Sequence, residues 1–250
     1  MLSNIFKNYT KKASINIYGG ISWSYETGYE EVVTNGIPTF YAVDYGSQRV
    51  VKFDSNWNYL GDYNLPFKYS FTLKYVLGFF YFSADNYFYK TDSSFNYINS
   101  TNDADAKFRQ FSYDSSNALF YVASYLVKQI NVYNTVPAYV KSINFPYDPY
   151  GLTIYNNRVF VAFFNSQNVG YFDLSDSTLI YYLTGVCSNA VSIYIEPLTG
   201  SVVTSCENTM RLDLVDSGLY IQASSQPYIF AFDIYRRLII NTQSSIDIYY

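Results

Sequence analysis

The sequence predicts an all-β protein, and three observations support this prediction. The first is composition, because the chain contains 31 Tyr and 20 Phe while charged residues make up only 14% of it. Aromatic and β-branched residues favour strands, whereas the helix-favouring residues Ala, Glu and Lys are scarce. The second is a set of segments in which apolar and polar residues alternate, as they do along a half-buried strand. The third is the regular return of one such segment along the chain.

The returning segment is an alternating strand that ends in an acidic or amide turn residue. Its first copy runs from Arg49 to Asp54 and reads Arg-Val-Val-Lys-Phe-Asp. Successive copies end 38, 42, 39, 40 and 37 residues apart, which is a period typical of β-propeller blades. The pattern therefore predicts six blades, with copies that end at Asp54, Asp92, Asn134, Asp173, Asp213 and Tyr250.

Each copy lies in the same local context, which predicts four antiparallel strands per blade. A strand such as Phe40–Asp44 precedes the copy, and a turn followed by another strand comes after it, as in Asp54–Leu60. Asp, Ser and Asn suit this turn because their short polar side chains bond to the local backbone. A further strand, such as Gly151–Tyr155, begins each unit.

The two ends of the chain predict how the ring closes. The last repeat, Pro227–Tyr250, has room for only three strands, while Ala13–Tyr18 is a spare alternating strand near the N-terminus. A strand from one end that completes a blade at the other protects the seam of a propeller. We therefore expect one propeller domain over residues 1–250, with residues 1–12 as an extension and residues 13–18 as the closing strand.

Two sets of motifs resemble known propellers. Phe40–Asp54 resembles the NHL repeat, whose core reads aliphatic-Tyr-Val-Ala-Asp, a short Gly/Asn loop, Arg-Ile/Val and Phe-Asp. Pro146–Tyr150 and Tyr155–Asn157 resemble the Pro-Tyr-x-Pro and Tyr-Asn-Asn motifs of extracellular NHL-like propellers of animals. Gly185–Cys187 and Thr204–Cys206 resemble a Gly-x-Cys segment and an Ala-Thr-Ser-Cys strand of the same propellers. The resemblance implies a six-bladed ring of NHL type, and those propellers have no assigned function.

Charge and composition exclude several function classes. A net charge of -4 and a pI near 4.8 argue against a nucleic-acid partner, and we interpret Lys7, Lys11 and Lys12 as a solvated strand edge. No apolar run approaches the ~18 residues of a membrane span, so we expect no membrane insertion. The chain has no His, which removes His-based triads, His general bases and His metal ligands. We expect no catalysis, no cofactor and no bound metal.

Cys187 and Cys206 are the only cysteines. Cys187 precedes the innermost strand of the fifth repeat and Cys206 ends the next, antiparallel strand, which places both at one face of the ring. We predict a disulfide and hence an oxidising, extracellular or secreted location. The alternative is a pair of buried free thiols, which leaves a cytoplasmic location open. Asn8 and Asn99 begin Asn-x-Ser/Thr triplets and are candidate N-glycosylation sites.

Propellers usually bind partners through the face built by two sets of loops. One set leads into each innermost strand, and the other joins the second strand of each blade to the third. We call this surface the lead-in face. Prolines lie near aromatic residues in several of its loops, and such rings with polar tips suit protein or glycan partners. The alternative is that the rings pack between blades. The candidate binding residues are Phe67, Tyr69, Tyr147, Tyr150 and Tyr228.

The sequence therefore favours a binding module, and two alternatives stay open. The first alternative is a structural subunit of a matrix or filament that self-assembles through its blade rims, since low charge weakens the solubility of a free monomer. The second is a calcium-dependent, lactonase-like hydrolase. Its oxygen ligands would come from Asn102–Asp105, Glu26, Glu30 and Glu31, although none recurs at a fixed place near the inner strands.

Overall fold

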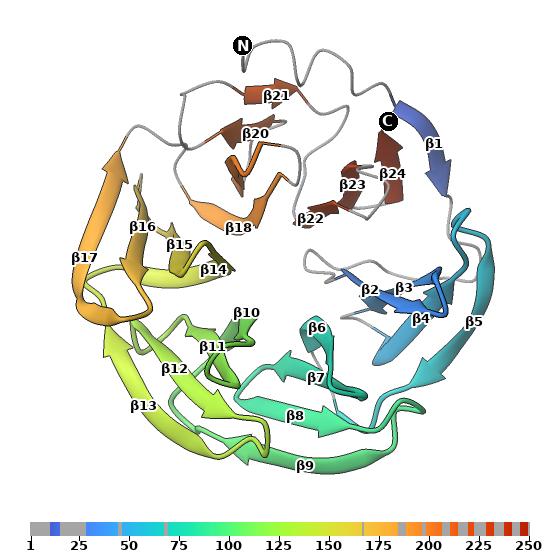
Figure 1. Cartoon of the computed structure of the whole chain (residues 1–250), viewed down its shortest axis with the longest axis horizontal. Helices are drawn as coiled ribbons and strands as arrows, with labels where there is room; N and C mark the ends of the chain where they lie inside the picture. The colour runs from blue at the N-terminus through green and yellow to red at the C-terminus, as the bar shows by residue number, and fades with distance from the viewer. Residues whose placement is uncertain are drawn as a thin grey trace. The chain divides into compact units, whose positions relative to one another are not determined.

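The computed structural model describes residues 11–15, 29–44, 47–67, 70–166, 168–184, 189–196, 199–206, 211–214, 220–222, 229–232, 238–241 and 246–249. The strands among these residues form six four-stranded antiparallel sheets (Figure 1). The chain divides into two compact units. The first unit is Ile21–Phe145, and the second unit is Met1–Gly20 together with Pro146–Tyr250. Within the described part of the chain, no helix is long and apolar enough to cross a membrane.

The first unit contains three sheets whose strands follow one another in chain order. Both β2 and β10 contact β6, so the first strands of neighbouring sheets lie next to each other, and we call them innermost. The sheets comprise β2 (Tyr29–Thr34), β3 (Ile37–Asp44), β4 (Arg49–Phe53) and β5 (Tyr59–Asn64); β6 (Ser70–Val76), β7 (Phe79–Ala84), β8 (Tyr87–Thr91) and β9 (Tyr97–Asn102); β10 (Phe108–Asp114), β11 (Leu119–Ser124), β12 (Gln129–Asn134) and β13 (Tyr139–Asn144).

The second unit contains three sheets of the same kind, and β14 and β22 both contact β18. Its third sheet takes its fourth strand, β1, from the N-terminal end of the chain. The sheets comprise β14 (Asp148–Tyr155), β15 (Arg158–Phe164), β16 (Asn168–Asp173) and β17 (Asp176–Thr184); β18 (Ala190–Ile195), β19 (Val202–Cys206), β20 (Arg211–Leu214) and β21 (Tyr220–Gln222); β22 (Ile229–Phe232), β23 (Leu238–Asn241), β24 (Ile246–Tyr249) and β1 (Lys11–Ile15).

The predicted repeat corresponds to the observed sheets. The returning segment forms the third strand of each sheet, namely β4, β8, β12, β16, β20 and β24, and the prediction of four antiparallel strands per repeat is confirmed. The N-terminal strand pairs with the last strand, with Ile15 opposite Ile246 and Lys11 opposite Tyr249. The strand was expected at residues 13–18 and is observed at Lys11–Ile15. A bulge between Lys11 and Ala13 places Lys11, rather than residue 12, opposite Tyr249. Residues 16–20 lie outside the described residues.

A repeated turn joins the third and fourth strands of the first two sheets. Asp54 accepts hydrogen bonds at Oδ1 from the backbone N–H groups of Asn56 (2.8 Å) and Asn58 (2.9 Å), and at Oδ2 from the Asn58 amide (2.9 Å). The turn places Trp57 at a φ of 64°, and its side chain is buried. The carboxylate therefore stabilises a left-handed residue that is normally unfavourable for a bulky side chain.

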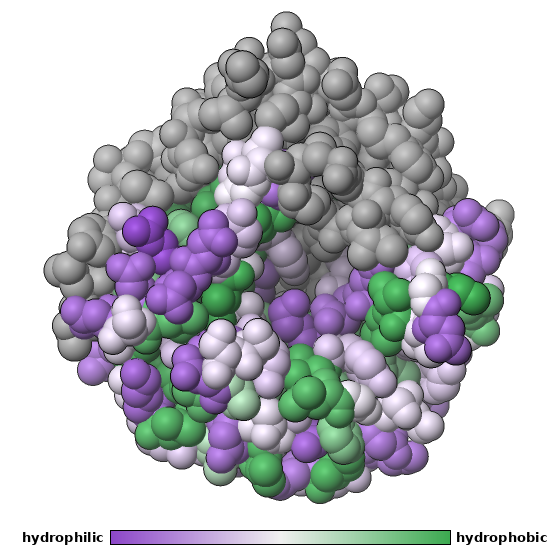
Figure 2. Space-filling view, in the orientation of Figure 1, coloured by the Kyte–Doolittle hydropathy of each residue, from purple (hydrophilic) through white to green (hydrophobic). Residues whose placement is uncertain are grey.

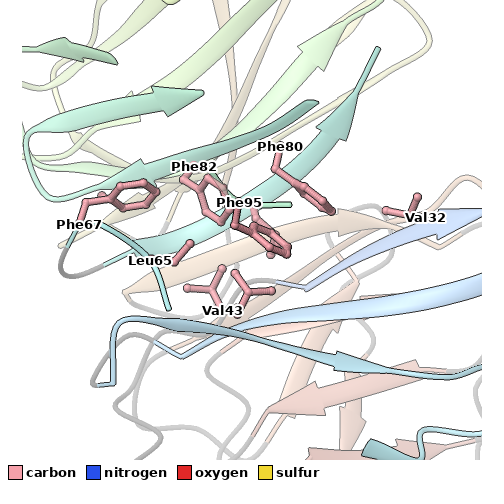
Figure 3. Packing of buried hydrophobic residues seen from close by; sticks show 10 residues of the cluster. Val32, Val43, Leu65, Phe67, Phe80, Phe82 and Phe95 are labelled. Atoms are coloured by element: carbon pink, nitrogen blue, oxygen red, sulfur yellow. The ribbon is translucent and has the colours of Figure 1, made fainter. Parts of the chain in front are cut away.

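Large aromatic side chains fill the space between the first two sheets. Phe80 and Phe82 come from β7, while Phe95 reaches the same cluster from the turn after β8, at a φ of 66° (Figure 3). Val43 of β3 and Leu65, which follows β5, approach from the neighbouring sheet. Because β7 and β3 present alternate residues to this layer, the packing follows directly from the strand period.

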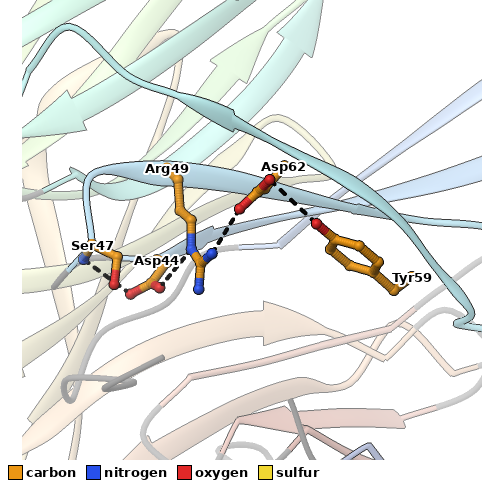
Figure 4. A network of polar contacts seen from close by, with 5 residues as sticks. All are labelled: Asp44, Ser47, Arg49, Tyr59 and Asp62. Carbon is orange, nitrogen blue, oxygen red and sulfur yellow. Dashed lines mark hydrogen bonds and ion pairs between the residues drawn. The ribbon is translucent and has the colours of Figure 1, made fainter. Parts of the chain in front are cut away.

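A polar network ties the β3–β4 connection to β5 (Figure 4). The fully buried carboxylate of Asp44 accepts a hydrogen bond from Arg49 Nε at 3.2 Å and from the Ser47 backbone N–H at 3.3 Å. Arg49 also contacts Asp62 at 2.6 Å, and the Tyr59 hydroxyl donates to Asp62 at 3.2 Å. These contacts explain the Asp and Arg of the Phe40–Asp54 motif as partners across one strand connection.

Candidate functional site

Four innermost strands have a β-bulge near the end where the chain enters them. The register shifts lie between Ser70 and Thr72 in β6, Phe108 and Phe111 in β10, Pro149 and Gly151 in β14, and Ala190 and Ser192 in β18. Bulges redirect side chains and are frequent beside functional sites. The described pairs of β2 and β22 have no such shift. The residues in the bulges are Phe71, Arg109, Gln110, Tyr150 and Val191.

In the first unit the bulges of β6 and β10 bring an arginine onto an aromatic ring. Arg109 Cζ lies 3.9 Å from the centroid of the Phe71 ring and 5.6 Å from that of Tyr125, which follows β11. Arg109 Nη1 donates to the Phe108 carbonyl at 3.1 Å. Phe71 is only 2% exposed, whereas Arg109 and Tyr125 are half-buried. Cation–π contacts stabilise such a pair by roughly 0.5–2 kcal/mol.

Several buried hydroxyl groups lie on β6 and β11, the strands that neighbour the strand of Arg109. Thr72 Oγ1 lies 2.8 Å from Ser83 Oγ and 3.4 Å from the Arg109 carbonyl oxygen, so it connects β6 to β7 and to β10. Ser70 and Ser124 are buried, and their hydroxyl oxygens have no hydrogen-bond partner among the described groups. Buried polar atoms without partners are few in folded proteins, so both positions require an explanation.

In the second unit two of the predicted tyrosines lie beside the end of β15. Tyr150, in the β14 bulge, stacks on Phe164 with ring centroids 5.2 Å apart and an interplanar angle of 30°. Tyr147 lies before β14 and contacts Phe163 with centroids 5.7 Å apart. Both tyrosines are half-buried, so each ring is supported on one side while part of it remains accessible. The prediction that both contribute to a binding surface is compatible with this geometry.

The prediction is wrong for Phe67. Its side chain is 5% exposed, and its ring stacks on Tyr89 with centroids 3.8 Å apart and an interplanar angle of 9°. It also contacts Phe82 edge-on at 5.3 Å, so the loop after β5 turns this ring into the core between two sheets. Burial of the apolar Phe67 ring is favourable, and the ring has no polar atom that would need to stay in contact with water. Tyr69 and Tyr228 lie outside the described residues.

Two of the acidic residues considered as calcium ligands, Glu30 and Asp103, contact other protein groups. Glu30 Oε1 accepts the Tyr75 backbone N–H at 2.9 Å, and Glu30 Oε2 lies 3.5 Å from Lys74 Nζ, so Glu30 connects β2 to β6. Burial raises the pKa of Glu30, and the charge of Lys74 partly opposes that rise. Asp103 accepts the Asn131 amide at 3.0 Å. No group of three or more His, Cys, Asp or Glu in the described residues is placed to hold a metal ion, and Glu26 lies outside those residues.

The predicted modification residues are described only in part. Cys206 is fully buried at the end of β19, and Cys187 lies outside the described residues, so the disulfide stays a prediction. Asn99 is half-buried in β9, where its Oδ1 accepts the Ser100 backbone N–H at 2.8 Å. Asn8 also lies outside the described residues. Glycosylation at Asn8 and Asn99 stays a prediction.

Sequence reasoning missed two features that the structure reveals. The first is the Arg109 site, for which the available signal was a charged residue within the strand pattern Phe108–Phe111 of a chain poor in charge. The second is a recurring pair of exposed residues at the start of the outer strands of the first unit. In each pair a Tyr precedes an aliphatic residue, and the pairs are Tyr59 and Leu60, Tyr97 and Ile98, and Tyr139 and Val140.

Neither a protein family nor a curated protein sequence matches this chain. Solved structures do resemble it. A streptogramin B lyase gives a TM-score of 0.73 at 9% identity over 98% of both chains. A catalytically inactive H270A virginiamycin B lyase from Staphylococcus aureus, with quinupristin, gives 0.68 at 10% identity over 96% of this chain and 99% of that one.

A third solved structure is the WD40 β-propeller domain of Doa1, with a TM-score of 0.65 at 11% identity over 88% of this chain and 77% of that one. Identities this low leave function open, but the likeness extends over most of each chain. Together with the four-stranded antiparallel sheets, these likenesses show that the chain has the β-propeller fold.

Proposed function

We propose that this chain is a non-catalytic binding propeller that recognises a protein or glycan through its lead-in face. The observation that carries the proposal is the set of bulges at the lead-in ends of four innermost strands. The proposal includes a closed ring of six blades of NHL type. The pairing of β1 with β24 supports the closure of the ring, and the Phe40–Asp54 motif supports the NHL type.

Side chains at the bulges have the properties that binding requires. Tyr150 and Tyr147 are each backed by a phenylalanine ring, and Arg109 is backed by Phe71. Side chains held in place before a partner arrives lose little conformational freedom on binding, which favours affinity. Each tyrosine adds a hydroxyl group to an apolar ring, and such residues are frequent hot spots of interfaces.

The absence of histidine from the sequence supports a non-catalytic role. The H270A variant of virginiamycin B lyase is described as catalytically inactive, so that enzyme depends on a histidine. This chain has no histidine at any position and cannot supply the same group. The resemblance to lyases therefore supports the propeller fold and not their chemistry.

The test selects ligands without assuming their identity. Wild-type chain is panned against a peptide phage library and a glycan array, and the selected ligands are measured again with Tyr147→Ala/Tyr150→Ala. We expect affinity to fall about thirtyfold, because two hot-spot residues at about 1 kcal/mol each together contribute about 2 kcal/mol. Tyr59→Ala, on an outer strand, is the matched control and should bind normally. Unchanged binding by the double variant, with its circular dichroism preserved, would place the site elsewhere.

The second candidate function is a structural subunit, which the outer strands of the first unit favour. β5, β9 and β13 lie at sheet edges, and each has a bulge after its first Tyr. The aliphatic residues there, Leu60, Ile98 and Val140, are 54%, 45% and 47% exposed. Exposed apolar side chains repeated at the blade period could contact other copies of the chain. Apolar side chains are also scattered among polar ones on the face seen in Figure 2.

Sedimentation velocity distinguishes this candidate from the binding module. If the outer strands mediate assembly, the wild-type chain forms larger species as concentration rises, and Leu60→Ser/Ile98→Ser/Val140→Ser remains monomeric. A wild-type chain that stays monomeric throughout removes the structural-subunit candidate and leaves the binding module in place.

We include in the proposal a secreted location and a Cys187–Cys206 disulfide. The supporting observations are the presence of two cysteines in the chain and the partly exposed Asn99 triplet. Intact mass spectrometry without reductant should show a chain two hydrogens lighter than the reduced form, because disulfide formation removes one hydrogen from each thiol. Alkylation of both thiols in the native, unreduced protein would exclude the bond.

A further inference from the structure

Three tyrosine rings lie in contact on β8 and at the start of β9, the edge strand of the second sheet (Figure 1). Tyr87 and Tyr89 belong to β8, and their ring centroids lie 5.2 Å apart at an interplanar angle of 23°. Tyr97 is the first residue of β9, and its ring centroid lies 6.3 Å from that of Tyr89 at an interplanar angle of 76°. Tyr89 therefore contacts both of the other rings, and we call the three residues the tyrosine cluster.

The tyrosine cluster is accessible from solvent. Tyr97 is 52% exposed, while Tyr87 and Tyr89 are half-buried. Burial, followed by the nearby phenols of Tyr87 and Tyr97, raises the pKa of Tyr89 to about 12. Tyr89 is therefore protonated at neutral pH, and its oxidation removes a proton together with the electron.

Packing explains the rings of the cluster but not their hydroxyl groups. Tyr89 stacks on Phe67 with ring centroids 3.8 Å apart, and this contact holds the Tyr89 ring in place. A phenylalanine would make the same contact, since stacking depends on the ring. Oxidative coupling does need phenols, because one-electron oxidants take a hydrogen atom from a phenol and not from a phenylalanine ring. Coupling also needs one exposed ring held against a second, which Tyr97 provides.

We propose that Tyr89 and Tyr97 form a dityrosine crosslink when a peroxidase oxidises the chain with hydrogen peroxide. Each phenol loses one electron and one proton, and a C–C bond forms between the ring carbons next to the two hydroxyl-bearing carbons. The hydrogens on the newly joined carbons move to the oxygens, which restores both hydroxyls. The two hydrogen atoms removed in total reduce one hydrogen peroxide to two water molecules.

Tyr97 is a better partner for Tyr89 than Tyr87 is. The new bond joins the edges of two rings that are twisted against each other, and the steep angle between Tyr89 and Tyr97 approaches this arrangement. Tyr87 and Tyr89 are stacked, so they present their faces to each other. Proximity also favours coupling within one chain over coupling between chains in dilute solution.

The crosslink joins the edge strand β9 covalently to β8. An edge strand has unpaired backbone groups along one side, and a bond to its neighbour keeps it in the sheet. The modification goes beyond the proposed function, because neither Tyr89 nor Tyr97 belongs to the loops of the lead-in face. Crosslinking also constrains the unfolded chain, so the melting temperature of the oxidised monomer should rise.

The experiment oxidises the dilute whole chain with a plant peroxidase and hydrogen peroxide. The monomer is isolated by size-exclusion chromatography and digested with trypsin. Trypsin cuts after Lys90, so Tyr89 and Tyr97 separate into the peptides 75–90 and 91–107, and Tyr97 is the only tyrosine of the second peptide. We expect these peptides to be joined and two hydrogens lighter than their sum, with fragmentation that places the bond at Tyr89.

Three conservative variants test which rings couple. Tyr89→Phe and Tyr97→Phe keep a ring but lack a phenol, and each should lose the joined peptides. Tyr87→Phe should retain them. If a variant does not fold, the peptide map of the wild-type chain still provides the test.

A second tyrosine pair is a matched control within the same chain. Tyr133 and Tyr139 have ring centroids 6.1 Å apart at an interplanar angle of 70°, close to the values for Tyr89 and Tyr97. Tyr133, however, is only 1% exposed. Both residues lie in the tryptic peptide 129–141, which should therefore keep its mass after oxidation.

Three results would overturn the inference. The first is an oxidised monomer in which the peptides 75–90 and 91–107 remain separate. The second is a joined pair that persists in folded Tyr89→Phe. The third is loss of two hydrogens from the peptide 129–141 in equal yield, because ring distance alone would then select the pair. The proposed function is tested separately, since its library ligands are measured on the chain without oxidation.

Discussion

The two units use the same four-stranded sheet but fill the space beside it with different side chains. The described core of the first unit is largely aromatic, with Phe80, Phe82 and Phe95 in one cluster and Phe88, Phe108, Phe111 and Phe120 in another. The described cluster of the second unit contains one buried ring, Phe160, and otherwise smaller residues such as Ala162, Ile193 and Val202, although Phe163 and Phe172 are buried elsewhere in that unit. The same backbone layout therefore accepts different side-chain volumes, provided that each layer is well packed.

One polar feature occurs in both units. Thr72 and Ser83 pair across β6 and β7 at 2.8 Å, and Ser192 and Ser205 pair across β18 and β19 at 2.6 Å, with all four side chains buried. The hydroxyl pair is present beside the aromatic core of the first unit and beside the smaller side chains of the second unit. We infer that the pair depends on the strand register next to the bulge of the innermost strand. Side-chain volume in the core varies independently of it.

Phe82→Ala should have the largest effect of the substitutions considered. The change removes a fully buried ring from the aromatic cluster and should lower the free energy of unfolding of the first unit by about 3–5 kcal/mol. Ile193→Val in the second unit removes one methylene and should cost about 0.5–1.5 kcal/mol. Hydrogen exchange followed by mass spectrometry reports each unit separately. Equal losses of protection would contradict the view that the first unit depends on its rings.

Thr72→Val should have an intermediate effect, because it leaves the buried Ser83 hydroxyl without its partner. Such an orphaned group costs about 1–3 kcal/mol. Thr72→Val/Ser83→Ala removes both hydroxyls and should recover most of the loss. The cycle of Ser192→Ala, Ser205→Ala and their double variant should give the same non-additive result in the second unit. Additive effects in either cycle would show that the pair is not a coupled unit.

Acid should have the smallest effect and should distinguish two turns of the first unit. Hydrogen bonds from the Asn96 amide and from the Asn96 and Ser94 backbone N–H groups hold the pKa of Asp92 below its ordinary value of 3.8. A lowered folded-state pKa means that the stabilisation is complete above pH ~4 and is lost as pH falls through the lower, folded-state value. The equivalent turn after β12 uses Asn134, which does not titrate.

Hydrogen-exchange NMR measures this difference directly. The Asn96 backbone N–H donates to Asp92 Oδ1 at 2.9 Å, and the Ala138 N–H donates to Asn134 Oδ1 at 3.0 Å. After correction for intrinsic exchange, protection of the Asn96 N–H should fall as pH drops below 3.8, whereas that of the Ala138 N–H should persist. Asp92→Asn is the control and should make the two turns behave alike. Parallel loss in the wild type would mean that acid opens the sheets as a whole.

The sequence by itself determined the strands, their repeat and their turns. Alternation along Arg49–Phe53 and its copies is a local property, since every second side chain of a strand lies on one face. Asp54 and Asp92 act on residues two and four positions away, so their turns were also readable from the sequence. These features depend on short-range contacts, which neighbouring residues specify.

Only the tertiary structure decided which aromatic residues are core and which are surface. Phe67 and Tyr147 both follow a proline directly, yet Phe67 stacks on Tyr89 in the core while Tyr147 remains half-buried. The Arg109 site likewise joins residues from β6, β10 and the loop after β11, which no local pattern connects. Burial depends on the residues that neighbouring sheets bring alongside. Those contacts span long stretches of sequence, and side-chain packing between sheets selects them.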